Sequence, residues 1–154
     1  MKTKLGAVTA FATATALLTS VAAAGPAATK QRVAIKIENG ASFILSPLTL
    51  GAIKPDAGLA SFCCWTARHT VRNGQAVEIN NPKMTLTGKR GTLVARNEIG
   101  YVDLPDGWAV FTGTWTVISG TGAYAGLTGG GRGAGATTPN GRFKSQFEGF
   151  LSPR

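Results

Sequence analysis

Turn signals recur along most of this chain at intervals of about ten residues, and they exclude a fold built on long helices. Beyond the first 24 residues, no window places apolar residues at i, i+3, i+4 and i+7 over three turns. Short runs of alternating apolar and polar residues lie between turns such as Asn39-Gly40 and Asn73-Gly74. The sequence therefore predicts an all-β fold.

About eight strands are predicted, and the short turns between them, without helical crossovers, indicate antiparallel neighbours. They cover residues 32–38, 42–46, 59–72, 75–79, 84–87, 92–102, 108–118 and 141–151, with a glycine-bearing strand expected within 120–135. Closing such a sheet on itself removes its exposed edges. We therefore predict an eight-stranded antiparallel up-and-down barrel, with a β-sandwich as the alternative.

The alternation also assigns inner and outer faces to the predicted strands, because successive side chains point to opposite sides of a sheet. In the long strand 59–72 the inner set is Cys63, Trp65, Ala67, His69 and Val71. The inner set of the first strand is Val33, Ile35 and Ile37, and that of the last is Phe143, Ser145, Phe147, Gly149 and Leu151.

The first 24 residues have the pattern of a secretory signal peptide. Lys2 and Lys4 form a positive start, residues 5–21 carry no charge, and Ala22-Ala23-Ala24 ends the stretch with small residues. An uncleaved membrane anchor is the alternative, although threonines dilute the apolar run. We predict a secreted protein with a signal peptide at 1–24, a short N-terminal segment at 25–31 and a barrel domain at 32–154.

The chain is basic, with a formal net charge of +9 that falls to +7 when Lys2 and Lys4 leave with the signal peptide. Such a surplus favours anionic partners, and for a secreted protein an anionic cell-wall polymer is one such partner. The positive residues are scattered rather than grouped, which equally fits a solvated surface and predicts no specific nucleic-acid binding. Two cysteines and one histidine exclude the usual metal centres, and no cofactor motif is present.

The two cysteines, Cys63 and Cys64, are adjacent in a predicted strand. Strand geometry turns neighbouring side chains apart, whereas a disulfide needs its two Cβ atoms close together. We therefore predict two unbridged thiols. A disulfide between the two neighbours, or a bridge to another molecule, remains the alternative in an oxidising compartment.

The stretch from Gly113 to Leu127, GTWTVISGTGAYAGL, resembles the signature of the allene oxide cyclase and dirigent barrel superfamily. The similarity is best to small secreted bacterial proteins with an allene-oxide-cyclase-like barrel, and it covers about 40 residues, from Trp108 to Phe150. The resemblance implies an eight-stranded barrel with an apolar interior. Its turn residues are interpreted as structural: Gly120 and Gly122 permit a positive φ, Gly126 permits close approach of backbones, and Tyr124 packs across the corner.

The catalytic residues of that superfamily do not carry over. Its cyclases use a glutamate inside the barrel, but Glu38 and Glu78 are interpreted as surface residues of this chain. Its dirigent proteins use paired aspartates, but Asp103 and Asp106 flank Pro105 in an ordinary turn composition.

The candidate ligand-cavity residues are Cys63, Trp65, His69 and Phe147, all from the predicted inner face. An interior His69 could act as an acid or base, while a hydrated histidine at a strand end is the alternative. The sequence favours a non-catalytic barrel that binds a small apolar ligand or serves as an extracellular surface module. A cyclase or isomerase, and a basic binder of cell-wall polymer, are the two alternatives, so enzymatic activity and oligomeric state stay open.

Overall fold

The computed structural model describes residues 29–39 and 41–154. The predicted signal peptide at 1–24 lies outside these residues, as does Gly40 of the predicted Asn39-Gly40 turn. The strands are β1 (Gln31–Glu38), β2 (Ser42–Pro47), β3 (Asp56–Cys63), β4 (Ala67–Arg72), β5 (Gln75–Asn80), β6 (Lys83–Gly88), β7 (Gly91–Asp103), β8 (Ala109–Gly120), β9 (Leu127–Thr137) and β10 (Phe143–Pro153). A single 3-10 turn, η1 (Gly122–Tyr124), accompanies them within the described ranges.

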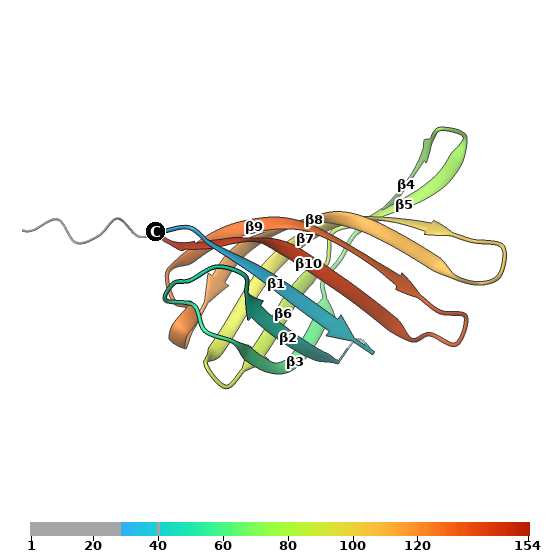
Figure 1. Cartoon of the computed structure of the whole chain (residues 1–154). Helices are drawn as coiled ribbons and strands as arrows, with labels where there is room; N and C mark the ends of the chain where they lie inside the picture. The colour runs from blue at the N-terminus through green and yellow to red at the C-terminus, as the bar shows by residue number, and fades with distance from the viewer. Residues whose placement is uncertain (1–28, 40) are drawn as a thin grey trace, which may run out of the picture.

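Eight of these strands form a closed barrel, which confirms the predicted fold and excludes the sandwich. Their order is β7-β6-β3-β2-β1-β10-β9-β8, and β8 pairs again with β7 to complete the circle (Figure 1). Every pairing is antiparallel, and β1 joins β10 with Ile35 opposite Phe147. Because neighbours in the barrel follow the chain order, the topology is up-and-down.

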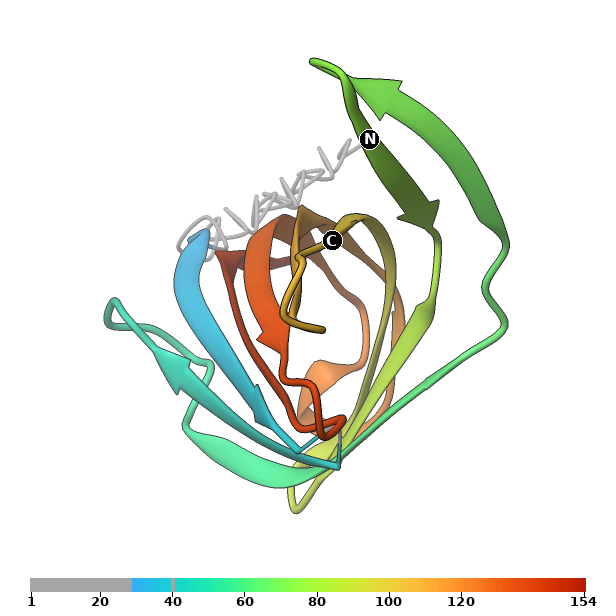
Figure 2. The same ribbon diagram turned by 90° about the vertical axis from the view of Figure 1, so that its right-hand side faces the viewer.

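The remaining two strands, β4 and β5, form a hairpin that extends beyond the barrel, and Figure 2 shows it standing away from the ring of strands. Asn73 and Gly74 close the hairpin with φ values of 51° and 79°, as a two-residue turn requires. The hairpin is anchored through β5, which pairs with the last part of β7 while β6 pairs with its first part. The hairpin leaves the barrel at one end, and we use the term mouth for that end.

The barrel interior is filled by side chains. Val33, Ile35 and Ile37 of the first strand and Phe147 and Leu151 of the last are buried, which confirms the predicted alternation there. Glycines of β9 stand beside the largest rings: Gly131 pairs with Trp115, Gly133 with Phe147 and Gly135 with Phe111. A Cβ at Gly133 or Gly135 would collide with the neighbouring phenyl ring, so these glycines make room for a close-packed core.

The opposite end, which we call the Tyr124 end, holds the glycine corner. Gly122 has φ +57°, as predicted, and a Cβ there would collide with the carbonyl oxygen of Arg90. The roles predicted for Gly120, a positive φ, and for Gly126, a close approach of backbones, are exchanged in the structure. Gly120 has no positive φ, and a Cβ there would collide with the carbonyl oxygen of Tyr124, whereas Gly126 has φ +69° and open space around it.

Tyr124 is buried at this corner, as the sequence predicts, and its hydroxyl donates to the carboxylate of Asp56, which lies outside the predicted strands. Asp56 opens β3, is 8% exposed, and accepts the backbone N–H groups of Ala57, Lys89 and Arg90. Burial raises the pKa of Asp56, but the hydrogen bonds from Tyr124 and from these amides outweigh it and hold the pKa below its usual value. No helix of the described chain is long and apolar enough to cross a membrane.

Candidate functional site

A pocket of about 340 Å³ lies at the mouth of the barrel, beside the base of the β4–β5 hairpin. Four of its seven lining side chains are aromatic, one is a carboxylate, one is an amide and one is a proline. They are Phe62, Trp65, Glu78, Asn80, Pro82, Tyr101 and Phe143. These residues come from the end of β3 and the link to β4, from β5 and the link to β6, and from β7 and β10.

The aromatic walls of the pocket are fixed by packing against one another. The ring of Phe143 lies stacked on that of Phe111 with centroids 5.3 Å apart, and Phe62 meets Phe143 edge-on at 5.9 Å. Tyr101 also packs against Phe111, with ring centroids 5.1 Å apart. Trp65 lies at the rim and is 57% exposed, so much of its indole is free to contact a ligand.

Glu78 supplies the polar side of the pocket and keeps 41% of its side chain exposed, so it lies at the surface, as interpreted, but beside the pocket. It is half-buried, stands opposite Tyr101 in the β5–β7 register, and accepts a hydrogen bond of 2.7 Å from Asn80 Nδ2. Burial raises the pKa of Tyr101, and the charge of Glu78 raises it further. The phenol therefore stays protonated near neutral pH and can donate a hydrogen bond.

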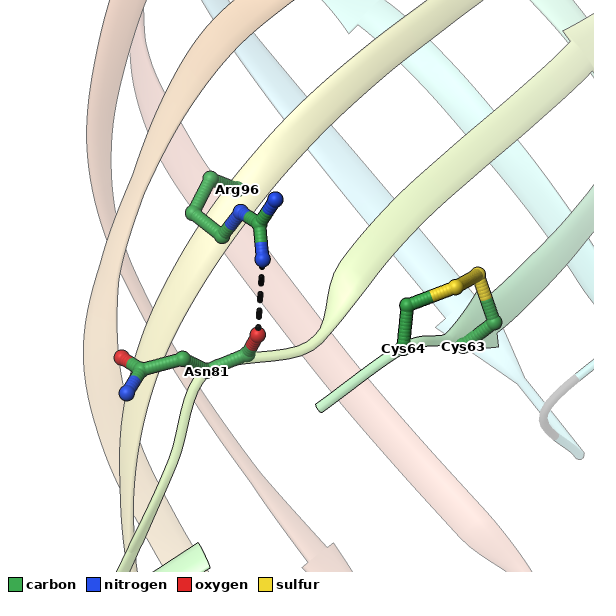
Figure 3. Close-up of a disulfide and its surroundings, with 4 residues drawn as sticks. All are labelled: Cys63, Cys64, Asn81 and Arg96. Atoms are coloured by element: carbon green, nitrogen blue, oxygen red, sulfur yellow. Dashed lines mark hydrogen bonds between the residues drawn. A yellow bond between two sulfur atoms is a disulfide. The ribbon is translucent and has the colours of Figure 1, made fainter. Parts of the chain in front are cut away.

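Cys63 and Cys64 form a disulfide, so the predicted pair of unbridged thiols is wrong (Figure 3). The bridge interrupts the predicted strand 59–72, since β3 ends at Cys63 and β4 starts only at Ala67. Cys64 takes φ +59°, a left-handed conformation that breaks strand alternation. The link between β3 and β4 is held to the link between β5 and β6, because the backbone N–H of Asn81 donates to the carbonyl of Thr66 at 3.3 Å. Arg96 Nη1 of β7 in turn donates to the carbonyl of Asn81 at 3.5 Å (Figure 3).

The four predicted cavity residues do not lie together in one site. Trp65 lines the pocket, and Cys63 is half-buried next to Phe62 and belongs to the disulfide. Phe147 is fully buried in the barrel core. The inward placement of His69 is wrong: its side chain is 79% exposed on the hairpin, where its Nε2 lies 3.9 Å from Glu78 Oε2. Because the hairpin continues past the barrel, its two faces are no longer an inner and an outer wall.

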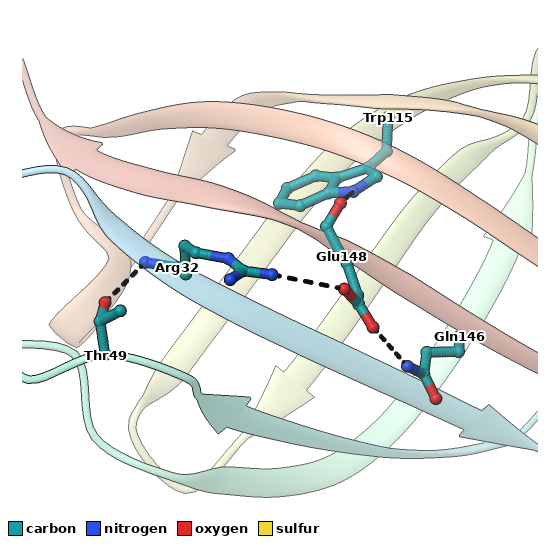
Figure 4. A network of polar contacts seen from close by, with 5 residues as sticks. All are labelled: Arg32, Thr49, Trp115, Gln146 and Glu148. Carbon is teal, nitrogen blue, oxygen red and sulfur yellow. Dashed lines mark hydrogen bonds and ion pairs between the residues drawn. The ribbon is translucent and has the colours of Figure 1, made fainter.

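A larger hollow of about 700 Å³ lies open to solvent on the outer wall, over β8, β9 and β10. Its side chains are polar and already engage one another. Glu148 accepts from Gln146 Nε2 at 2.6 Å and pairs with Arg32 at 3.8 Å, and Trp115 Nε1 donates to the Glu148 carbonyl from within the wall (Figure 4). This hollow has no aromatic lining, so the mouth pocket is the better ligand site.

Within residues 29–39 and 41–154, no three His, Cys, Asp or Glu side chains are grouped as a metal site would need. No family model, no curated protein and no solved structure matches this chain. The resemblance to the allene oxide cyclase and dirigent superfamily therefore stays a prediction.

Proposed function

We propose that this protein is a secreted, non-catalytic barrel that binds a small, largely apolar ligand in the mouth pocket. The observation that carries the proposal is the grouping of Phe62, Trp65, Tyr101 and Phe143 around a single hollow. Its volume of about 340 Å³ is that of a small-molecule site, and an apolar lining with a few polar groups is typical of such sites.

The rest of the barrel supports a site at the mouth rather than deep inside. The interior below the pocket is filled by buried residues such as Met84, Leu93 and Phe147, so a ligand would enter only the upper layers. Two of the lining rings, those of Tyr101 and Phe143, already pack on Phe111, which reduces the side-chain ordering that binding would require.

Binding can be measured with N-phenyl-1-naphthylamine, an uncharged aromatic dye whose fluorescence rises in apolar surroundings. We expect Trp65→Ala to weaken dye binding at least about tenfold, since a pocket tryptophan is a typical binding hot spot. Trp108→Ala is the matched control, because Trp108 is 43% exposed and does not line the pocket. Equal dye affinity in the two variants would contradict the proposed site.

The same titration separates the proposal from the binder of cell-wall polymer. Dye binding at an aromatic pocket should change little with salt, whereas attraction of a polyanion to a basic surface weakens steeply as salt rises. If the protein does not bind the dye but binds an anionic polymer more weakly as salt rises, the result would favour the binder of cell-wall polymer.

A cyclase or isomerase is the second candidate, and it rests on Glu78 facing the pocket opposite Tyr101. A carboxylate that accepts a proton and a phenol that donates one are a workable pair for rearranging an apolar substrate. If this is the function, a ligand that co-purifies with Glu78→Gln should be the unconverted form of the one held by the unmodified protein. Identical ligands in both proteins would argue for binding alone.

A further inference from the structure

Four buried side-chain atoms of the described residues have no hydrogen-bond partner in the protein. They belong to three side chains: Asn80 Oδ1, both Oδ1 and Nδ2 of Asn97, and Ser145 Oγ. Buried polar atoms are nearly always hydrogen-bonded, so a group of unpartnered ones requires an explanation.

All three side chains lie at or just below the mouth pocket. Asn80 lines it directly. Asn97 is 1% exposed on β7, and its backbone N–H donates to the carbonyl of Pro82, a pocket wall, at 3.0 Å. Ser145 is 8% exposed and lies on the same face of β10 as Phe143, two residues deeper in the barrel.

The layers below contain no comparable group. Beyond Pro82 and Asn97, the next inward pair in the β6–β7 ladder is Met84 with Ala95, followed by Leu86 with Leu93. On β10 the residue after Ser145 on the inner face is Phe147. The unpartnered atoms therefore form a polar layer, which we call the polar floor, beneath the aromatic pocket and above the apolar core; Asn80 lines the pocket, whereas Asn97 and Ser145 are covered.

We propose that this polar floor selects the ligand by a hydroxyl group, so that the occupant of the pocket is an uncharged ring compound bearing a hydroxyl. A hydroxyl both donates and accepts, which matches the amide of Asn97 and the hydroxyl of Ser145 together. The carboxylate of Glu78 beside the pocket disfavours an anionic group in its place. This inference rests on the proposed function, because it specifies what the same pocket recognises.

The test compares two probes of similar shape, 2-naphthol and 2-methylnaphthalene, in calorimetric or fluorescence titrations. The methyl compound is the more apolar, so binding by apolar contact alone would favour it. We expect the unmodified protein to bind 2-naphthol about tenfold more tightly, since a site built for a hydroxyl rejects an analogue that lacks it. In Asn97→Leu the affinity for 2-naphthol should fall about tenfold while that for 2-methylnaphthalene is kept or improved.

Ser145→Ala should give a smaller loss in the same direction. Met84→Leu is the control for a general disturbance of the core, because it keeps the volume one layer deeper and should leave the preference unchanged. Thermal unfolding of each variant verifies that it is folded, and Asn97→Leu should be no less stable than the unmodified protein, since it removes buried unpartnered atoms.

Two outcomes would overturn this inference and leave the proposed function intact: equal or weaker binding of 2-naphthol by the unmodified protein, or a preference that survives in both Asn97→Leu and Ser145→Ala. If neither compound binds, the proposed function falls and the hydroxyl preference falls with it.

Discussion

The hydroxyl of Tyr124 donates a hydrogen bond of 2.8 Å to Oδ2 of Asp56, which lies 68 positions earlier in the chain. The same carboxylate accepts three backbone N–H groups, two of them from the Lys89-Arg90 turn. One buried side chain thereby fastens the start of β3, the β6–β7 turn and the glycine corner to one another. Both residues are distant from the mouth pocket, so their contribution is to stability.

Because the pKa of Asp56 is lowered in the folded protein, we expect the protein to lose stability in acid. The unfolded aspartate takes up its proton near pH 3.8, whereas the folded one, with its lowered pKa, resists until the pH is lower. The unfolded state therefore binds more protons in that window, and stability falls as the pH drops through and below 3.8. Asp56→Asn should unfold about 2 kcal/mol more easily at pH 7 and show a flatter dependence on acid pH in denaturant titrations.

Asp103→Asn is the matched control, because Asp103 is exposed at the other end of the barrel. It should behave like the unmodified protein at every pH. Equal stability of Asp56→Asn and Asp103→Asn at pH 7 would show that the carboxylate does not hold this end together.

Because the pKa of Tyr124 is raised in the folded protein, we expect stability to fall as the pH rises in alkali. Burial raises the pKa of Tyr124, and the hydrogen bond to Asp56 and its charge raise it further above the ordinary value of 10.0. Between that value and the higher folded pKa, the unfolded tyrosine loses its proton while the folded one keeps it, so stability falls as the pH rises. Tyr124→Phe should make this alkaline slope shallower, as followed by circular dichroism, and leave the part due to Tyr101, whose pKa is also raised; an unchanged slope would contradict the prediction.

Gly122 is the glycine whose substitution should damage the fold. At φ +57° a β-branched residue is strained by about 1–3 kcal/mol, and its Cβ would also collide with the carbonyl of Arg90. We expect Gly122→Val to lower the melting temperature by at least about 5 °C. Gly126→Ala is the comparison, since Gly126 shares the positive φ but has open space, and it should lower the temperature less. Equal melting of both variants would show that the close approach at Gly122 is unimportant.

The Cys63–Cys64 bridge predicts a defined result in mass spectrometry. The denatured, unreduced protein should be two hydrogens lighter than its thiol form and should take up no alkylating reagent. Removing the bridge with Cys64→Ser leaves a non-glycine residue at φ +59°, so the β3–β4 junction should relax and dye binding next to it should weaken. Two alkylated cysteines in the unreduced protein would contradict the bridge.

The barrel could be predicted from the sequence because its cause is local and repeated. Period-two alternation assigns the buried face of β1 and β10, and Asn73-Gly74 fixes the hairpin turn. Glu78, by contrast, could not be identified as a pocket residue from the sequence, because its surroundings depend on which strand pairs with β5. β5 pairs with β7 over only three residues, Glu78 to Asn80, and no local pattern indicates that pairing.

The disulfide escapes prediction for a related reason. Alternation argues correctly that Cys63 and Cys64 cannot bridge within a strand, but the chain leaves the strand at that point. The hairpin that follows this break stands away from the barrel, and the side chain of His69 on it is exposed to solvent. The two predictions that fail here, the unbridged thiols and the inward His69, both rest on an unbroken strand from Leu59 to Arg72.

Binding of a small apolar molecule at the mouth can be located by a two-dimensional amide NMR titration with N-phenyl-1-naphthylamine. The signals of Phe62, Glu78 and the Trp65 indole should shift in a saturable way, while those of Arg90 and Tyr124 at the opposite end should not. Shifts at the Tyr124 end alone, or none at saturating dye, would contradict a binding site at the mouth.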